Sequence, residues 1–220
     1  EMCIRDRCTD IAEMVEHLCG ADKHIQPMAD LRLIGDTARS MVHDALDSYI
    51  GGDAEKAKGV TMRDDIVDAA LERVILHLTN IMRESPDAVS QAVDMLFVAK
   101  YFERIADHAD NLAGYTRLLN KRNISFSPAA QKEIAAMRDI CLECVDYLLT
   151  PVAGNVEWLS EVSALEQRID DMTSDYRRSH LERMRSGECS DEACIIYAEL
   201  LTDFERIGDH VLNIAQERSS

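Results

Sequence analysis

Two stretches of the chain carry acidic residues at helical spacing and are near copies of each other. Phe-Glu-Arg-Ile-Ala-Asp-His at 102–108 corresponds to Phe-Glu-Arg-Ile-Gly-Asp-His at 204–210, a shift of 102 residues. In each copy a Glu and an Asp are four residues apart, so their carboxylates lie on one face of a helix. Such a pair could help to bind a cation if further acidic groups faced it.

The segment before the first copy supplies a second acidic pair, Asp64 and Asp68. Asp64 and Asp107 stand on opposite sides of the break at Ser85 and are almost equally far from it along the chain. Asp68 and Glu103 are also almost equidistant from this break, and both are closer to it. Short connections make neighbouring helices antiparallel. These matched arm lengths therefore predict that the four carboxylates share one level.

The same match of arm lengths recurs around Gly187. Glu166 before this glycine and Asp209 after it are almost equally far from it along the chain. Asp170 and Glu205 form the corresponding inner pair. Each pair taken alone would be read as an ordinary solvated helix face, but the duplicated register favours two acidic pockets.

Four carboxylates in one pocket repel each other unless a cation or protons intervene. Oxygen ligands suit hard or borderline ions, so we expect divalent or trivalent iron, manganese or magnesium. An asparagine one turn beyond each pair would add an amide oxygen. The predicted ligands are Asp64, Asp68, Glu103, Asp107 and Asn111 in one copy, and Glu166, Asp170, Glu205, Asp209 and Asn213 in the other. His108 and His210 are about 100° away around the helix and are expected to lie beside the ligands.

The elements that must position these acids are predicted to be helices. Gly and Pro are scarce, with 9 and 4 residues, and they divide the chain into segments. Ser127 and Ser190 stand where N-terminal caps belong, as does Asp87. We predict an all-α fold of tandem three-helix bundles, with helices over 8–19, 28–50, 54–84, 87–119, 128–149, 155–186 and 190–218.

The domain boundaries follow from the repeat. Residues 28–120 and 125–219 form one three-helix unit each, and residues 8–20 are interpreted as the remnant of a preceding unit. Residues 1–7 read Glu-Met-Cys-Ile-Arg-Asp-Arg, which resembles a translated sequencing adapter. We therefore expect the fold to be truncated at its N-terminal side, and residues 1–7 enter no functional argument.

Composition narrows the classes of partner. The net charge is −17, from 24 Lys+Arg and 41 Asp+Glu, and it disfavours nucleic acid and anionic lipid. It suits cations and basic protein surfaces. An odd count of 7 cysteines without framework spacing favours a reducing cytoplasm. Cys141 and Cys144 form a lone CxxC, which we interpret as two small apolar residues on one helix face rather than half of a metal or redox site.

The repeated motif, together with Arg-Asp-Asp-Ile-Val-Asp at 63–68, is similar to the signature of the PhoU family of phosphate-uptake regulators. The resemblance covers nearly the whole chain after residue 8. It implies tandem three-helix bundles with metal clusters at the acidic positions named above. Ala106 departs from the family pattern, which has glycine there.

The resemblance also implies a function and partners. PhoU proteins work in the cytoplasm with a phosphate ABC transporter and a sensor histidine kinase, and they damp the phosphate-starvation response. The chain would then reach the membrane only through its partners and would have no catalytic turnover. The sequence does not decide whether it forms a homodimer.

Two alternatives remain. Tyr-Arg-Arg-Ser-His-Leu-Glu-Arg at 176–183 resembles the PhoU-like tail of bacterial sodium–phosphate cotransporters. A metal-dependent enzyme is disfavoured, because di-iron helical bundles use Glu-x-x-His and here Asp107 and His108 are adjacent.

Overall fold

The computed structural model describes residue 25, residues 28–149 and residues 156–218, and these residues form helices joined by short turns. The α-helices are α2 (Ala29–Gly51), α3 (Ala54–Glu84), α4 (Val89–Arg122), α5 (Pro128–Leu149), α6 (Val156–Ser186) and α7 (Asp191–Arg218), and a 3-10 turn, η1 (Pro86–Ala88), precedes α4. The predicted all-α class is therefore confirmed, with most helix ends within two residues of their predicted positions. The expected helix at 8–19, the remnant at 8–20 and the segment 1–7 lie outside the described residues.

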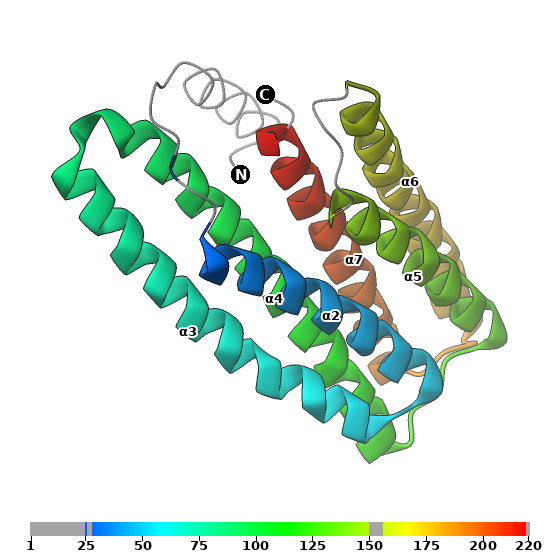
Figure 1. Ribbon diagram of the computed structural model, residues 1–220. Coiled ribbons are helices and arrows are strands. Elements are labelled where there is room, and N and C mark those ends of the chain that lie inside the picture. The colour runs from blue at the N-terminus through cyan, green and yellow to red at the C-terminus, as the bar shows by residue number, and fades with distance from the viewer. Residues whose placement is uncertain (1–24, 26–27, 150–155, 219–220) are drawn as a thin grey trace.

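The helices form two bundles of three, placed side by side (Figure 1). Helices α2, α3 and α4 pack against one another, and α5, α6 and α7 do the same. The bundles meet mainly where α4 lies against α7, and α2 also contacts α5. The last helix of each repeat thus forms the centre of the molecule.

The helix ends follow local sequence. Asp53 caps α3 by accepting hydrogen bonds from the backbone N–H groups of Glu55 and Lys56. The hydroxyls of Ser127 and Ser190 accept the N–H groups three residues on, at 3.3 Å each, so both predicted caps are confirmed. The predicted cap at Asp87 is wrong, because the chain after Ser85 first makes the 3-10 turn and Ala88 precedes α4.

The apolar residues of the repeated motif build the cores. Phe102 and Ile105 are buried in the first bundle, as Phe204 and Ile207 are in the second. Their hydrophobic burial holds the acidic faces of α4 and α7 in a fixed rotation, because the two sets of side chains share each helix.

Gly208 marks a close approach between α6 and α7. A Cβ at this position would stand 3.1 Å from Cδ1 of Ile169. In the repeat, the corresponding pair of the first bundle is Ala106 and Val67, both fully buried. In the second bundle glycine faces the larger isoleucine, and in the first bundle alanine faces the smaller valine. This compensation explains why alanine replaces glycine only in the first copy.

The interface between α4 and α7 is antiparallel and nearly symmetric. His108 and His210, equivalent in the repeat, stack with ring centroids 5.6 Å apart. Nδ1 of His108 lies 2.8 Å from Oδ1 of the buried Asp203, whereas His210 stacks on Tyr101 at 5.9 Å. Asp203 and Tyr101 are also equivalent positions in the repeat, so the two histidines have different partners at the same place.

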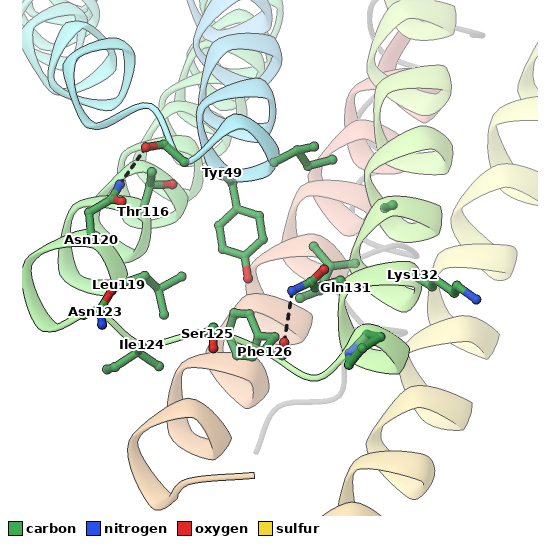
Figure 2. A pocket seen from close by; sticks show the side chains of 15 residues that line it. Tyr49, Thr116, Leu119, Asn120, Asn123, Ile124, Ser125, Phe126, Gln131 and Lys132 are labelled. Carbon is green, nitrogen blue, oxygen red and sulfur yellow. Dashed lines mark hydrogen bonds between the residues drawn. The ribbon is translucent and has the colours of Figure 1, made fainter. Parts of the chain in front are cut away.

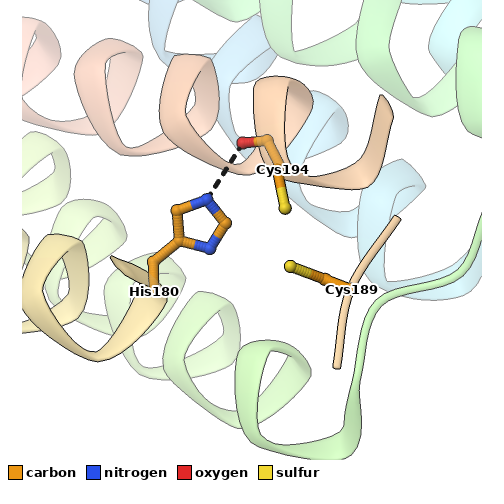
Figure 3. Close-up of side chains that lie close together, drawn as sticks. All are labelled: His180, Cys189 and Cys194. Carbon is orange, nitrogen blue, oxygen red and sulfur yellow. Dashed lines mark hydrogen bonds between the residues drawn. The ribbon is translucent and has the colours of Figure 1, made fainter. Parts of the chain in front are cut away.

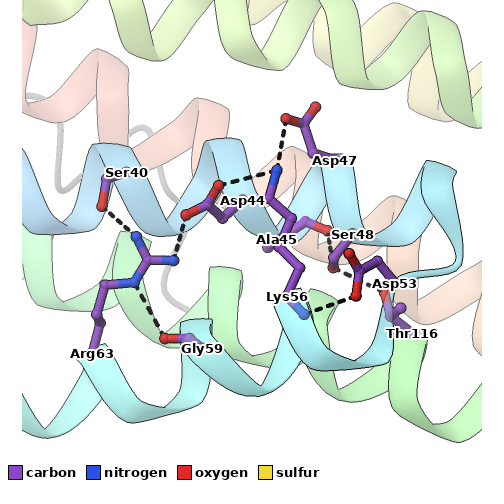
Figure 4. Close-up of polar contacts among 10 residues, drawn as sticks. All are labelled: Ser40, Asp44, Ala45, Asp47, Ser48, Asp53, Lys56, Gly59, Arg63 and Thr116. Carbon is purple, nitrogen blue, oxygen red and sulfur yellow. Dashed lines mark hydrogen bonds and ion pairs between the residues drawn. The ribbon is translucent and has the colours of Figure 1, made fainter.

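A polar network ties α2 to α3 in the first bundle (Figure 4). Arg63 donates to Oδ2 of Asp44 at 2.6 Å and to the hydroxyl of Ser40 at 2.7 Å, and Nζ of Lys56 lies 3.2 Å from Asp44. Burial opposes ionisation of Asp44, but the hydrogen bonds from these two cations outweigh it and lower the pKa of this carboxyl. In the second bundle the positions of Arg63 and Lys56 hold the buried Leu165 and Trp158, so apolar contact replaces the network.

A cavity of about 580 Å³ lies where the linker 123–127 joins the bundles (Figure 2). Tyr49 points into it, and Asn120 and Gln131 close its wall with hydrogen bonds to the carbonyls of Gly52 and Phe126. Its lining contains no carboxylate or histidine, so this cavity is distinct from the acidic sites. Within the described part of the chain, no helix combines the length and the apolar character that a bilayer crossing requires.

Candidate metal centre

The second bundle brings three acidic residues into a compact group. Glu166 and Asp170 on α6 and Asp209 on α7 each offer one carboxylate oxygen, and these oxygens all lie within 4.8 Å of one another. The two α6 residues are one helical turn apart, and the buried apolar residues of α7 rotate Asp209 toward them. The Asp209 side chain is only 11% exposed, so the group is partly withdrawn from water.

Proton affinities in this group are raised. Burial, followed by repulsion from Asp170 and Asp209, raises the pKa of Glu166 to about 7. Burial and the Asp170 carboxylate raise the pKa of Asp209 to about 6. Burial and the nearby Glu205 raise the pKa of Asp170. These shifts place Glu205 close to the group and show that proton or cation capture would relieve repulsion.

Two arginines border this acidic group without filling it. Arg177 donates to Oε2 of Glu205 at 2.8 Å, and Arg206 donates to Oδ2 of Asp209 at 3.4 Å. Oδ1 of Asp170 is buried yet has no hydrogen-bond partner. A buried carboxylate oxygen without a donor is costly, and a coordinated cation would satisfy it.

The first bundle holds a looser set. Burial, and then repulsion from Asp110 and Asp68, raises the pKa of Asp64 to about 6, and Asp107 adds to that shift. Burial and Glu103 raise the pKa of Asp107. Carboxylates of α3 and α4 therefore do face one another, as the arm lengths predict. No compact trio comparable to that of the second bundle is present here among the described residues.

The Glu103 carboxylate of the first bundle has a cationic partner on its own helix. Nζ of Lys100 lies 2.8 Å from Oε1 of Glu103, while Oε2 of Glu103 is buried without a hydrogen-bond partner. The equivalent residue of the second bundle is Thr202, which carries no charge. Glu205, the counterpart of Glu103, is paired instead with Arg177 of α6, so in both bundles this glutamate already has a cationic partner.

Asp110 belongs to the first acidic set although the repeat comparison missed it. It is a principal neighbour of Asp64 and accepts a hydrogen bond of 2.6 Å from the hydroxyl of Thr61. Its equivalent is Leu212, so the duplication gave no signal. Its spacing of three residues from Asp107, on the same helix face, would have identified it.

The two asparagines that were predicted as ligands, Asn111 and Asn213, lie in different surroundings. The amide of Asn111 is exposed and donates to Asp203 across the α4–α7 interface at 3.4 Å. Asn213 is half-buried on α7. His108 and His210 both face the α4–α7 interface. Burial, then the neighbouring His108, lowers the pKa of His210 to about 3, so this ring is neutral.

The family is decided by a domain model. The model of the PhoU domain matches the chain twice, at residues 31–116 and 134–217. The chain belongs to the PhoU family. The two matches fall on the two bundles and include both acidic groups.

Relatives of this PhoU-family chain carry names from phosphate transport. The phosphate-specific transport system accessory protein PhoU homolog of Clostridium acetobutylicum is 38% identical over 111 residues, 50% of this chain and 50% of that protein. The phosphate-specific transport system accessory protein PhoU homolog 1 of Thermotoga maritima is 27% identical over 180 residues, which are 80% of this chain and 77% of that protein. The matched segment thus spans about half the length of the Clostridium relative.

Solved PhoU structures share the architecture. The crystal structure of PhoU from Pseudomonas aeruginosa superimposes with a TM-score of 0.78 over 95% of each chain, at 19% identity. The regulatory protein PhoU of the phosphate transport system from Streptococcus pneumoniae gives 0.69 over 98% of this chain and 94% of that chain, at 16% identity. At these identities the likeness supports the fold, and the acidic groups are argued from this chain alone.

Proposed function

We propose that this chain is a metal-binding regulator of phosphate uptake. It acts by binding other proteins and carries out no chemical turnover. The observation that carries the proposal is the duplicated set of carboxylates on tandem PhoU bundles, with Glu166, Asp170 and Asp209 gathered within 4.8 Å in the second.

The donor set supports a cation such as iron, manganese or magnesium. Carboxylate oxygens with raised pKa values repel one another, and Asp170 keeps a buried oxygen without a partner. The second bundle would bind the ion through these three residues, with Glu205 beside them. In the first bundle Asp64, Asp68, Glu103 and Asp107 would hold an ion more weakly, because among the described residues no three of them are gathered as closely as the trio of the second bundle.

The partners follow from the family and from charge. The relatives are named as accessory proteins of a phosphate-specific transport system. A net charge of −17 favours docking on basic protein surfaces. We infer that the chain docks in the cytoplasm on phosphate ABC transporter subunits and on a sensor histidine kinase, and thereby damps the phosphate-starvation response.

A reporter experiment tests this function. The chain, or its Glu166→Gln/Asp209→Asn variant, is expressed in a bacterium that lacks its own PhoU and carries a phosphate-starvation reporter. The wild-type chain should lower reporter output in high phosphate and retain transporter and kinase subunits in a pull-down. The variant should do so less well. Unchanged reporter output together with failure to retain either partner would contradict the proposal.

A further inference from the structure

A second group of possible metal donors lies at the end of the second bundle, away from the acidic group. His180 on α6, Cys189 in the turn and Cys194 on α7 each offer one donor atom, and the three atoms lie within 4.8 Å of one another (Figure 3). His180 follows Asp170 by ten residues, which is about 15 Å along a helix. The two groups are therefore separate sites.

We propose that His180, Cys189 and Cys194 bind a thiophilic divalent cation, with Zn²⁺ the best match. One imidazole nitrogen and two thiolate sulfurs are ligands that zinc prefers. Two thiolates would balance the charge of the ion, so the loaded site would be neutral. The four residues between the two cysteines fall within the spacing common in zinc sites.

The orientation of His180 is fixed in the manner of a metal ligand. Its Nε2 lies 3.1 Å from the backbone carbonyl oxygen of Cys194. Because a carbonyl only accepts, Nε2 carries the proton and Nδ1 keeps its lone pair. Figure 3 shows the other ring nitrogen turned toward the two sulfurs. The ring also lies against that of Tyr197, with centroids 4.6 Å apart and the planes tilted by 31°, which restricts its rotation.

The surroundings allow a cation to enter and stay. Arg183 is the cation whose charge acts on both His180 and Cys194. Its guanidinium is held by two hydrogen bonds, of 2.6 and 2.9 Å, to the Glu133 carboxylate. His180 and Cys194 are largely buried but line a groove of about 580 Å³, and Asp191 lines it as well. The groove gives an ion an entry path and an additional negative charge.

Without an ion the Cys194 thiol is inert. Burial, then the hydrogen bond with Cys189, raises the pKa of Cys194 to about 11, so this thiol holds its proton at neutral pH. Metal binding would release that proton. The bound ion would tie the end of α6 to the start of α7 and stabilise the turn between them.

Cobalt substitution tests the site, because Co²⁺ bound to thiolate gives a sulfur-to-metal charge-transfer band that oxygen-bound Co²⁺ does not. The reduced, chelator-treated full chain should develop this band with one equivalent of Co²⁺, and Zn²⁺ should abolish it. The band should be lost in Cys194→Ser and in Cys189→Ser. It should persist in Cys8→Ser, which removes a cysteine outside the described residues, and in Asp170→Asn, which alters the acidic group.

A second readout covers the case in which Cys194→Ser folds poorly. Cys189 lies in the turn and is only half-buried, so Cys189→Ser should keep the helical circular dichroism of the wild type. Zn²⁺ should slow amide exchange over residues 181–194 in the wild type and leave it unchanged in Cys189→Ser. The proposal is overturned if the folded wild type shows no charge-transfer band, or if the band survives in Cys189→Ser.

Discussion

At the scale of single residues, the acidic group of the second bundle is a competition between protons and metal ions. Glu166 has a folded-state pKa of about 7 against an ordinary value of 4.5, because it is buried beside Asp170 and Asp209. Near neutral pH the apo group therefore shares protons that a metal must displace. Metal affinity should consequently rise with pH across this range.

Stability of the apo protein should depend on pH through Glu166. Its raised pKa means that the folded state binds the proton more tightly than the unfolded state does. The stabilisation is present at low pH and is lost as pH rises from about 4.5 to about 7. After allowance for solvent screening, we expect a loss of about 1–2 kcal/mol. Urea denaturation at pH 5 and pH 8, in the presence of a chelator, measures this loss.

The variant Glu166→Gln is the control for this effect, since it keeps the shape and cannot titrate. The free energy of unfolding of this variant should depend less on pH than that of the wild type. Some pH dependence should remain, because the other acidic residues still titrate. Saturating metal should reverse the sign, because the ion favours ionised carboxylates. Equal pH dependence of the apo wild type and Glu166→Gln would show that Glu166 is not perturbed.

At the scale of helices, residue size at one crossing sets the distance between the acidic faces. Gly208 lets α7 approach Ile169 on α6, and a Cβ there would lie 3.1 Å from Cδ1. The first bundle solves the same crossing with Ala106 and Val67. The glycine–isoleucine pair of α7 and α6 and the alanine–valine pair of α4 and α3 should therefore be exchangeable only as complete pairs.

A double-mutant cycle tests this coupling. In the wild-type background Gly208→Ala gains helix propensity but meets Ile169, so its net effect on the free energy of unfolding should be small. In an Ile169→Val background Cδ1 is gone, and Gly208→Ala should stabilise by about 0.5–1 kcal/mol. Denaturant unfolding of the four proteins gives the coupling energy. A coupling of zero would contradict the proposed close approach.

Much of the helical architecture was predictable from sequence because proline, glycine and serine mark the helix ends. Arm lengths around Ser85 and Gly187 predicted that acids on neighbouring helices would face each other. Lys100 stands three residues before Glu103, a spacing that lets the two side chains meet on one helix face, but the sequence does not show which of the neighbouring acids it contacts. Asp110 was missed because the repeat places Leu212 at its position.

The group at His180 was not predicted either. Cys189 and Cys194 looked scattered in sequence, and their histidine lies nine residues upstream of the first of them. The turn after α6 reverses the chain and brings all three donors together. Spacing along one helix cannot reveal such a group, because it depends on the tight turn between two helices.

At the scale of the whole molecule, the bundles are held together by a partly polar interface between α4 and α7. Asp203 is buried there and interacts with His108 at 2.8 Å and with Asn111 at 3.4 Å. Farther along the same interface, Arg122 pairs with Glu192 at 2.7 Å, but both side chains are more than half exposed. The two contacts should differ greatly in energy.

Removing one partner from each contact checks this difference. His108→Ala leaves the Asp203 carboxylate buried with a lost partner, which should lower the free energy of unfolding by about 1–3 kcal/mol. Arg122→Ala, the matched control, should cost less than about 1 kcal/mol. Urea unfolding monitored by circular dichroism measures both. Equal costs would argue against a buried polar contact between the bundles.

The central claim is that the carboxylates of the second bundle bind a metal ion, and Mn²⁺ binding tests it most directly. The spin-resonance signal of free Mn²⁺ disappears as the ion binds, so titration of the apo chain gives stoichiometry and affinity. We predict that Asp209→Asn weakens the tightest site at least about tenfold, or roughly 1.4 kcal/mol. Asp175→Asn, which removes an exposed carboxylate farther along α6, should leave that site unchanged. An apo chain that leaves Mn²⁺ free, or equal affinities in the two variants, would contradict the account.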